Sequence, residues 1–128
     1  TLAALCAKHH TAEQLNEIEE LHQDFIESVN DVARYKAVNL DWHLAISRAS
    51  GNEPLIALME AISRPIRDAM DYQHVTTPDL RQVAVAAHTK IIEAIRARDS
   101  ETAYRRMERH VSAYREIAVS EIKEASVV

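Results

Sequence analysis

The fold of this chain is decided by a stretch in its first half, which reads NLDWHLAISRASGN over residues 39–52. Its apolar side chains recur at helical spacing, so we predict a helix over about Arg34–Ser50. The helix is expected to stop at Gly51, the only glycine of the chain, because glycine adopts the left-handed C-cap conformation at little cost. Asn52 can then cap a following helix, with Pro54 tolerated in its first turn.

The composition extends the helical prediction to the whole chain. Of its 128 residues, 47% are hydrophobic and 27% are charged, and the length fits one domain over residues 1–128. Only one Gly and three Pro are present, too few for the many tight turns of a β-sandwich or a β-barrel. We therefore predict an all-α domain of about six helices.

Capping signals place the other helices. A first helix should end near His9, because Thr11 opens a capping box with Gln14. Pro65 is expected to kink the helix that follows Asn52, since a proline inside a helix removes a backbone hydrogen bond. The remaining helices are expected from Thr11 to about Val32, from Thr77-Pro78 to about Arg98, and from Asp99 or Ser100 to about Ile122.

Charge and cysteine content narrow the cellular setting. Fifteen Lys and Arg against 20 Asp and Glu give a net charge of −5, so the chain as a whole would be repelled by nucleic-acid phosphates. Cys6 stands alone and cannot form an internal disulfide, which fits a reducing compartment. No stretch is both long and apolar. We expect a cytoplasmic domain without a membrane partner.

Polar side chains interrupt the apolar face of the helix expected over residues 34–50. Asn39 and His43 are four residues apart, so both project from adjacent turns of one face, whereas Asp41 falls on the opposite side. Burying an amide and an imidazole together costs free energy unless a partner satisfies them. We therefore expect these two side chains to have a partner.

The last two helices each carry one more inward histidine. His88 lies in the middle of an apolar stripe, and so does His110. Each is about eleven residues from the turn near Asp99, so an antiparallel hairpin would bring both to the same height, roughly 16 Å from the turn. Histidines that converge from facing helices hold divalent metals, but each could also be a hydrogen-bonded core residue. Both interpretations stay open at this point.

The other histidines are less informative. His22 also falls on an apolar face, with no polar neighbour one turn away, so we interpret it as a hydrogen-bonded core residue or a pocket wall. His9, His10 and His74 lie near expected helix ends and should be solvated.

These segments resemble the FCD domain, the C-terminal effector-binding domain of the FadR subfamily of GntR-family bacterial transcription regulators. The family pattern has an acidic residue, then an aromatic residue and His, then an Ala-Ser-Gly-Asn turn, and it is matched over residues 39–52 apart from the first position. The resemblance continues in HTKIIEAI over residues 88–95 and in Asp99, Ala103, Met107 and His110.

The resemblance implies an antiparallel helical bundle around a cavity, in which one acidic residue and three histidines bind a metal. On this chain those positions are Asn39, His43, His88 and His110, so an amide replaces the acidic ligand. An amide oxygen can coordinate a metal but brings no charge, so metal binding should weaken and an anion should be favoured to complete the shell. Three imidazoles and an oxygen suit Zn²⁺, the default, or Ni²⁺, copper or iron.

The resemblance also implies a small-molecule effector, which we expect to be a small carboxylate that modulates DNA binding by the intact protein. Arg81 lies on the His88 stripe and Arg106 borders the His110 stripe, so either guanidinium could pair with a carboxylate. Alternatively, each lies along apolar surface with its charged head in water. A homodimer is implied, and operator DNA would be read by an N-terminal winged helix-turn-helix domain, which nothing in this chain resembles.

Two other functions are compatible with the same residues. One is a helical-bundle metalloenzyme that acts through a metal-bound water, and the other is a metal-free helical interaction module. We do not expect an enzyme, because hydrolytic zinc sites usually add a carboxylate base and the inward faces offer no clear one.

Overall fold

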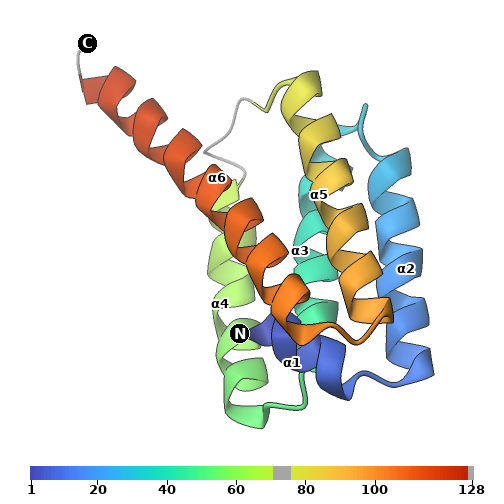
Figure 1. Cartoon of the computed structure of the whole chain (residues 1–128). Helices are drawn as coiled ribbons and strands as arrows, with labels where there is room; N and C mark the ends of the chain where they lie inside the picture. The colour runs from blue at the N-terminus through green and yellow to red at the C-terminus, as the bar shows by residue number, and fades with distance from the viewer. Residues whose placement is uncertain (71–75, 127–128) are drawn as a thin grey trace.

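The computed structural model contains six α-helices and no strands over the residues that it describes, 1–70 and 76–126 (Figure 1). The prediction of an all-α domain of about six helices is therefore confirmed. The helices are α1 (Leu2–His9), α2 (Ala12–Glu27), α3 (Val32–Arg48), α4 (Glu53–Met70), α5 (Pro78–Arg96) and α6 (Ser100–Ser126).

The predicted caps form, with one addition. The Thr11 hydroxyl accepts a hydrogen bond from the backbone N–H of Gln14, whose side chain accepts one from Thr11 in return. Asp31 caps α3 through the backbone N–H of Arg34, and this was missed in the sequence. As a result α2 ends at Glu27 rather than near Val32, because the turn before Asp31 separates the two helices.

Turn chemistry explains the other boundaries. Gly51 adopts the expected left-handed conformation, with φ of 71°, after α3. Helix α4 continues through Pro65. Helix α5 ends at Arg96 rather than Arg98, because Arg98 itself takes a left-handed φ of 57° and turns the chain into α6. Asp99 then accepts a hydrogen bond from the backbone N–H of Thr102, and α6 continues past Ile122.

Helices α1, α3 and α5 each pack against several of the other helices. Helix α3 contacts α1, α2 and α4, while α5 contacts α1, α2 and α6. Helix α1 lies across one end of the bundle, and the C-terminal part of α6 extends beyond the other helices (Figure 1). Over the described residues, none of the helices has the span and hydrophobicity of a transmembrane segment.

Among the described residues, two apolar clusters fill the interior. The larger lies near α1 and includes Cys6, Ile18, Ile46 and Ile95, all almost fully buried. Burial raises the pKa of the Cys6 thiol to about 12, so this cysteine acts as an unreactive core residue. The smaller cluster consists of Phe25, Tyr35 and Ala84, with Val38 and Val85 against it.

Candidate metal centre

Three histidines from three helices meet between the two apolar clusters. His43 comes from α3, His88 from α5 and His110 from α6, and each offers a ring nitrogen within 4.8 Å of the other two. The Nε2 atoms of His88 and His110 are 3.0 Å apart. Two imidazole nitrogens on one tetrahedral zinc ion lie ~3.3 Å apart at ordinary Zn–N bond lengths. The predicted convergence of these three histidines is therefore present in the fold.

Aromatic side chains fix the ring of His88. The Trp42 ring stacks on His88 with centroids 3.8 Å apart and planes within 7°. The Phe25 ring stacks on it as well, with centroids 4.5 Å apart and planes 20° apart. The rings of His43 and His110 are nearly parallel to each other, and each stands almost perpendicular to His88. Packing between Trp42 and Phe25 thus fixes the orientation of the His88 ring.

The three imidazoles are neutral near pH 7 because the interior disfavours their charged form. Burial lowers the pKa of His43 to about 3, with a further decrease from the proximity of His110. Burial lowers the pKa of His110 to about 4 and that of His88 well below its ordinary value. Neutral imidazole is the form that binds a metal, so each ring has a lone pair for coordination near neutral pH.

Asn39 supplies the test of whether a cation fits this centre. It lies one helical turn from His43 on α3, and its Oδ1 atom is buried without a hydrogen-bond partner among the described residues. A buried carbonyl oxygen without a partner is unfavourable unless a cation or a donor meets it. Asp41 is no substitute, because its carboxylate pairs with Arg67 on the outer side of α3 and α4. The three imidazole nitrogens fit a cation, and the unpartnered oxygen of Asn39 is of a chemical type that a cation can satisfy.

The two predicted effector arginines have different surroundings. Arg81 is buried, its Nη1 donates to the backbone carbonyl of Thr76 over 2.9 Å, and its Nε is buried without a partner among the residues described. Arg106 is half-buried, donates to the backbone carbonyl of Lys90 and lies 3.7 Å from the Glu93 carboxylate. Arg106 therefore contacts the surface of α5.

The remaining histidines differ in how deeply their side chains are buried. His22 is buried and its Nε2 lies 2.9 Å from the Thr89 hydroxyl, which confirms the interpretation as a hydrogen-bonded core residue. His9 is exposed, as expected. The prediction that His10 is solvated is wrong. Its side chain is buried, and its Nδ1 is hydrogen-bonded to the backbone carbonyl of Cys6 at the C-terminal end of α1. His74 lies outside the described residues.

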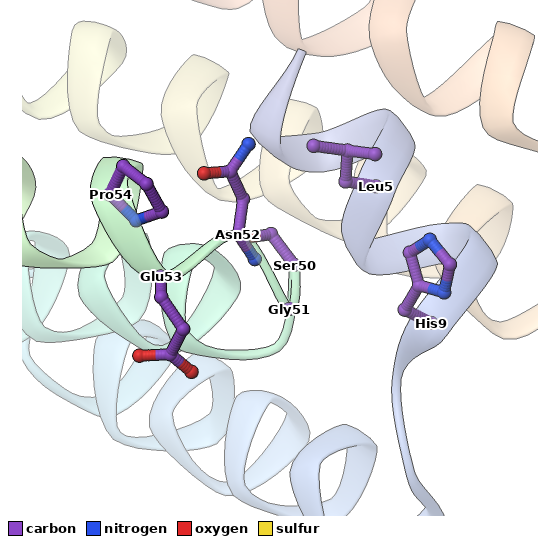
Figure 2. Close-up of a pocket in the computed structure, with 7 residues that line it drawn as sticks. All are labelled: Leu5, His9, Ser50, Gly51, Asn52, Glu53 and Pro54. Atoms are coloured by element: carbon purple, nitrogen blue, oxygen red, sulfur yellow. The ribbon is translucent and has the colours of Figure 1, made fainter.

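A surface pocket lies away from the three histidines. It has a volume of about 580 Å³ and is formed by Leu5 and His9 of α1 together with residues 50–54 of the turn into α4 (Figure 2). A cavity around the three histidines stays a prediction.

Phe25 was not identified in the sequence as part of the centre, although its spacing of three residues from His22 places both on one face of α2.

Comparison with known proteins identifies the fold. The FCD domain family matches residues 1–113. A solved structure of Streptococcus agalactiae GntR is 24% identical with a TM-score of 0.78, and the match covers 91% of this chain and 52% of that one. The structure of E. coli McbR/YncC is 20% identical with a TM-score of 0.81, and covers 94% of this chain and 58% of that one. This chain thus spans a little more than half the length of either protein. Among curated proteins, none matches the sequence.

Proposed function

The chain belongs to the FCD domain family, and from this premise we propose that it senses an effector and forms the dimer of a GntR-family, FadR-type transcription regulator. The observation that carries the proposal is the convergence of His43, His88 and His110 in the interior of a domain of this family. A sensor is favoured over an enzyme because no Asp, Glu or Cys joins the three-histidine group among the described residues.

The first part of the proposal is a divalent metal. Asn39, His43, His88 and His110 would hold it, with Zn²⁺ as the default and Ni²⁺ or iron as alternatives. Such a metal would supply a coordination position for an acidic ligand. The contribution of the chain is to present unprotonated nitrogens and to fix the His88 ring between Trp42 and Phe25.

The second part is a small carboxylate effector. Three neutral imidazoles and an amide leave the full charge of a dication uncompensated, which favours an anion in the remaining position. Arg81 adds a buried guanidinium whose Nε has no partner within the described part of the chain, so it is a second candidate for a carboxylate contact. Arg106 is the weaker candidate because its contacts are with α5.

The third part is the coupling to DNA. In the intact regulator, the effector would favour one arrangement of a dimer and so change the spacing of two N-terminal winged helix-turn-helix domains. The coupling must equal the difference in effector affinity between the two arrangements. We place the intact regulator in the cytoplasm, where it meets its operator.

The proposal is tested by elemental analysis of protein purified without added metal, followed by thermal shift against small carboxylates with and without chelator. We expect close to one equivalent of a divalent transition metal per chain. We also expect carboxylates to raise the melting temperature of the metal-loaded protein more than that of the chelated protein. An equal shift in both would remove the metal from the sensing mechanism.

The role of Asn39 is tested by Asn39→Asp. A charged ligand should tighten metal binding by ~10-fold, and because it neutralises part of the cation's charge it should weaken carboxylate binding. Asn39→Ala should weaken metal binding instead. Isothermal titration with Zn²⁺ and then with a carboxylate measures both effects. An unchanged metal affinity in both variants would show that residue 39 is not a ligand.

A further inference from the structure

His88 makes its closest aromatic contacts through the two faces of its ring. Its Nδ1 atom is buried without a hydrogen-bond partner among the described residues, whereas a metal-bound histidine usually donates its second N–H to an oxygen. The Trp42 ring stacks on His88 with centroids 3.8 Å apart, and the Phe25 ring with centroids 4.5 Å apart. Two rings this close and this parallel cannot share one face of an imidazole, so they cover opposite faces.

Trp42 is the closer of the two rings and the more electron-rich. Its plane lies within 7° of the His88 plane, and it also stands nearly perpendicular to the His43 ring, with centroids 5.0 Å apart. Among aromatic side chains, indole attracts a cation to its face most strongly. Trp42 is fully buried, so water does not screen this attraction. It therefore contacts two of the three histidines of the centre with the ring best suited to positive charge.

A cation in the three-histidine centre would make the Trp42 stack more favourable. No Asp, Glu or Cys belongs to this group within the part of the chain that the structure describes, so the charge of an ion would not be compensated there. An imidazole bound to the ion takes up part of its positive charge, and a positively charged ring is attracted to the face of an indole. The uncharged ring of the metal-free domain lacks this attraction.

Resting on the metal site of the proposed function, we propose that Trp42 is a positioning residue that raises metal affinity through cation–π attraction between its indole face and the metal-bound His88 ring. The aromatic face takes the place of the oxygen that ordinarily supports a histidine ligand through a hydrogen bond. Metal affinity should then follow the electron density of the ring at position 42, and not its shape alone.

The composition of the chain allows this electron density to be changed at one ring. Trp42 is the single tryptophan and Phe25 the single phenylalanine, so a fluorinated analogue of either amino acid replaces one side chain. Fluorine withdraws electrons from the indole face with little change of shape. The Nε1 atom of Trp42 has no hydrogen-bond partner among the described residues, so a more acidic N–H alters no hydrogen bond to them.

Zinc titration against a competing chelator measures the affinity of domains that contain tryptophan, 5-fluoro-, 5,7-difluoro- or 5,6,7-trifluorotryptophan. We expect the zinc affinity to fall about twofold with each fluorine, and at least about fivefold over the series. Urea denaturation of the metal-free domains should give nearly equal stabilities. Equal zinc affinities across the series would overturn the proposal and leave Trp42 a purely steric role.

The control for size is 5-methyltryptophan, because a methyl group is larger than fluorine but does not withdraw electrons. The zinc affinity of this domain should match that of the unlabelled domain. A loss as large as that of the trifluoro domain would assign the effect to volume and overturn the proposal.

Phe25 supplies the matched comparison on the opposite face of His88. Its ring is farther away and tilted by 20°, and phenyl attracts a cation less strongly than indole. Incorporation of 4-fluorophenylalanine should therefore lower zinc affinity less than 5-fluorotryptophan does. An equal or larger loss at Phe25 would overturn the assignment to Trp42.

Substitutions test the same role without analogues. Trp42→Leu removes the aromatic face and should lower zinc affinity ~10-fold, while Trp42→Phe should recover part of the loss. Ile46→Ala is the control, because Ile46 is buried one turn further along α3 and its truncation destabilises the fold without removing a ring. It should retain wild-type zinc affinity. Equal losses in Ile46→Ala and Trp42→Leu would assign the effect to stability and overturn the proposal.

The unlabelled domain separates this inference from the proposed function. If it binds no zinc, the proposed metal site fails and the inference fails with it. If it binds zinc with an affinity that fluorination does not change, the inference alone fails.

Discussion

Two neighbouring stretches of α5 show how differently one helix face can be used. Ile91 and Ile95 are fully buried in the larger apolar cluster, where the side chains require only van der Waals contact. His88, one turn earlier on the same face, is equally buried but has a ring nitrogen without a hydrogen-bond partner among the described residues. Such an atom does not stabilise a core, because a buried unpaired polar group reduces the free energy of unfolding by about 1–3 kcal/mol.

The stabilising core and the proposed site therefore occupy separate layers of the bundle. The cluster near α1 holds the helices together, while the layer around His88 contains buried polar atoms that have no partner among the described residues. Proteins accept such local costs at functional sites. Substitutions in the two layers should therefore have opposite consequences for folding and for binding.

The largest expected effect is the loss of metal binding in His88→Leu. Removing one of three imidazoles should weaken zinc binding on the order of 10³-fold, about 4 kcal/mol. The stability of the metal-free domain should change by about 1 kcal/mol or less, because leucine fills the space between Trp42 and Phe25 without a polar atom. Titration with zinc and urea denaturation measure the two quantities. His9→Leu, at an exposed position, should retain wild-type zinc affinity.

The next effect is a steep pH dependence of the metal-free domain. Burial holds the pKa of His43 at about 3 and that of His110 at about 4, below the ordinary 6.5, so the unfolded chain binds more protons between these values. The free energy of unfolding should therefore be highest above pH 6.5 and fall by ~1.4 kcal/mol per pH unit for each histidine as pH decreases towards 4.

Urea denaturation in the presence of chelator between pH 7.5 and 5 measures this slope. His110→Gln should reduce the slope of the unfolding free energy against pH by the contribution of one histidine, ~1.4 kcal/mol per pH unit. His9→Gln should leave the slope unchanged. A metal-free domain whose stability is flat over this range would contradict the neutral, buried state of the cluster.

The converse experiment in the apolar layer is Ile95→Ala. Ile95 is fully buried and two turns from His88, so truncation should reduce stability by about 3 kcal/mol through lost burial and a residual cavity. At that distance the zinc affinity should stay within about twofold of wild type. Thermal denaturation and zinc titration test both. A large loss of zinc affinity in a folded Ile95→Ala domain would mean that the two layers are coupled.

The smallest expected effect concerns the α5–α6 turn, which holds the His88 and His110 helices in register. Arg98 has a φ of 57°, where glycine is preferred, and its guanidinium donates to the backbone carbonyls of Lys8 and His10 at the end of α1. Arg98→Gly and Arg98→Ala both lose these bonds, but glycine relieves the backbone strain. The glycine variant should therefore be about 1 kcal/mol more stable than the alanine variant in urea denaturation, with zinc affinity unchanged in both.

Helix faces were predictable from the sequence because the 3.6-residue period is a local property. Asn39 and His43 share a face of α3 whatever surrounds them, and equal distances of His88 and His110 from one turn place them at the same height in any antiparallel hairpin. The predictions that failed were those where two local interactions compete for the same segment. Asp31 proved a better cap than the sequence suggested and shortened α2, and the His10 side chain folded back on the Cys6 carbonyl instead of entering solvent.

Contacts between helices distant in sequence could not be predicted in the same way. The stacking of Phe25 on His88 and the bond from His22 to Thr89 depend on how α2 packs against α5, over separations of more than sixty residues. The contact of Arg106 with the surface of α5 likewise depends on the rotation of α6 about its axis.

Local sequence signals specified the helical class, most caps and the inward positions of His22, His43, His88 and His110, because propensity and periodicity act within a few turns of chain. The packing of helices distant in sequence brings three imidazole nitrogens within 4.8 Å of one another and leaves Nδ1 of His22 buried without a partner among the described residues. Those outcomes are set by side-chain packing between helices, and the free energy of packing depends on all the surfaces that meet rather than on any one segment.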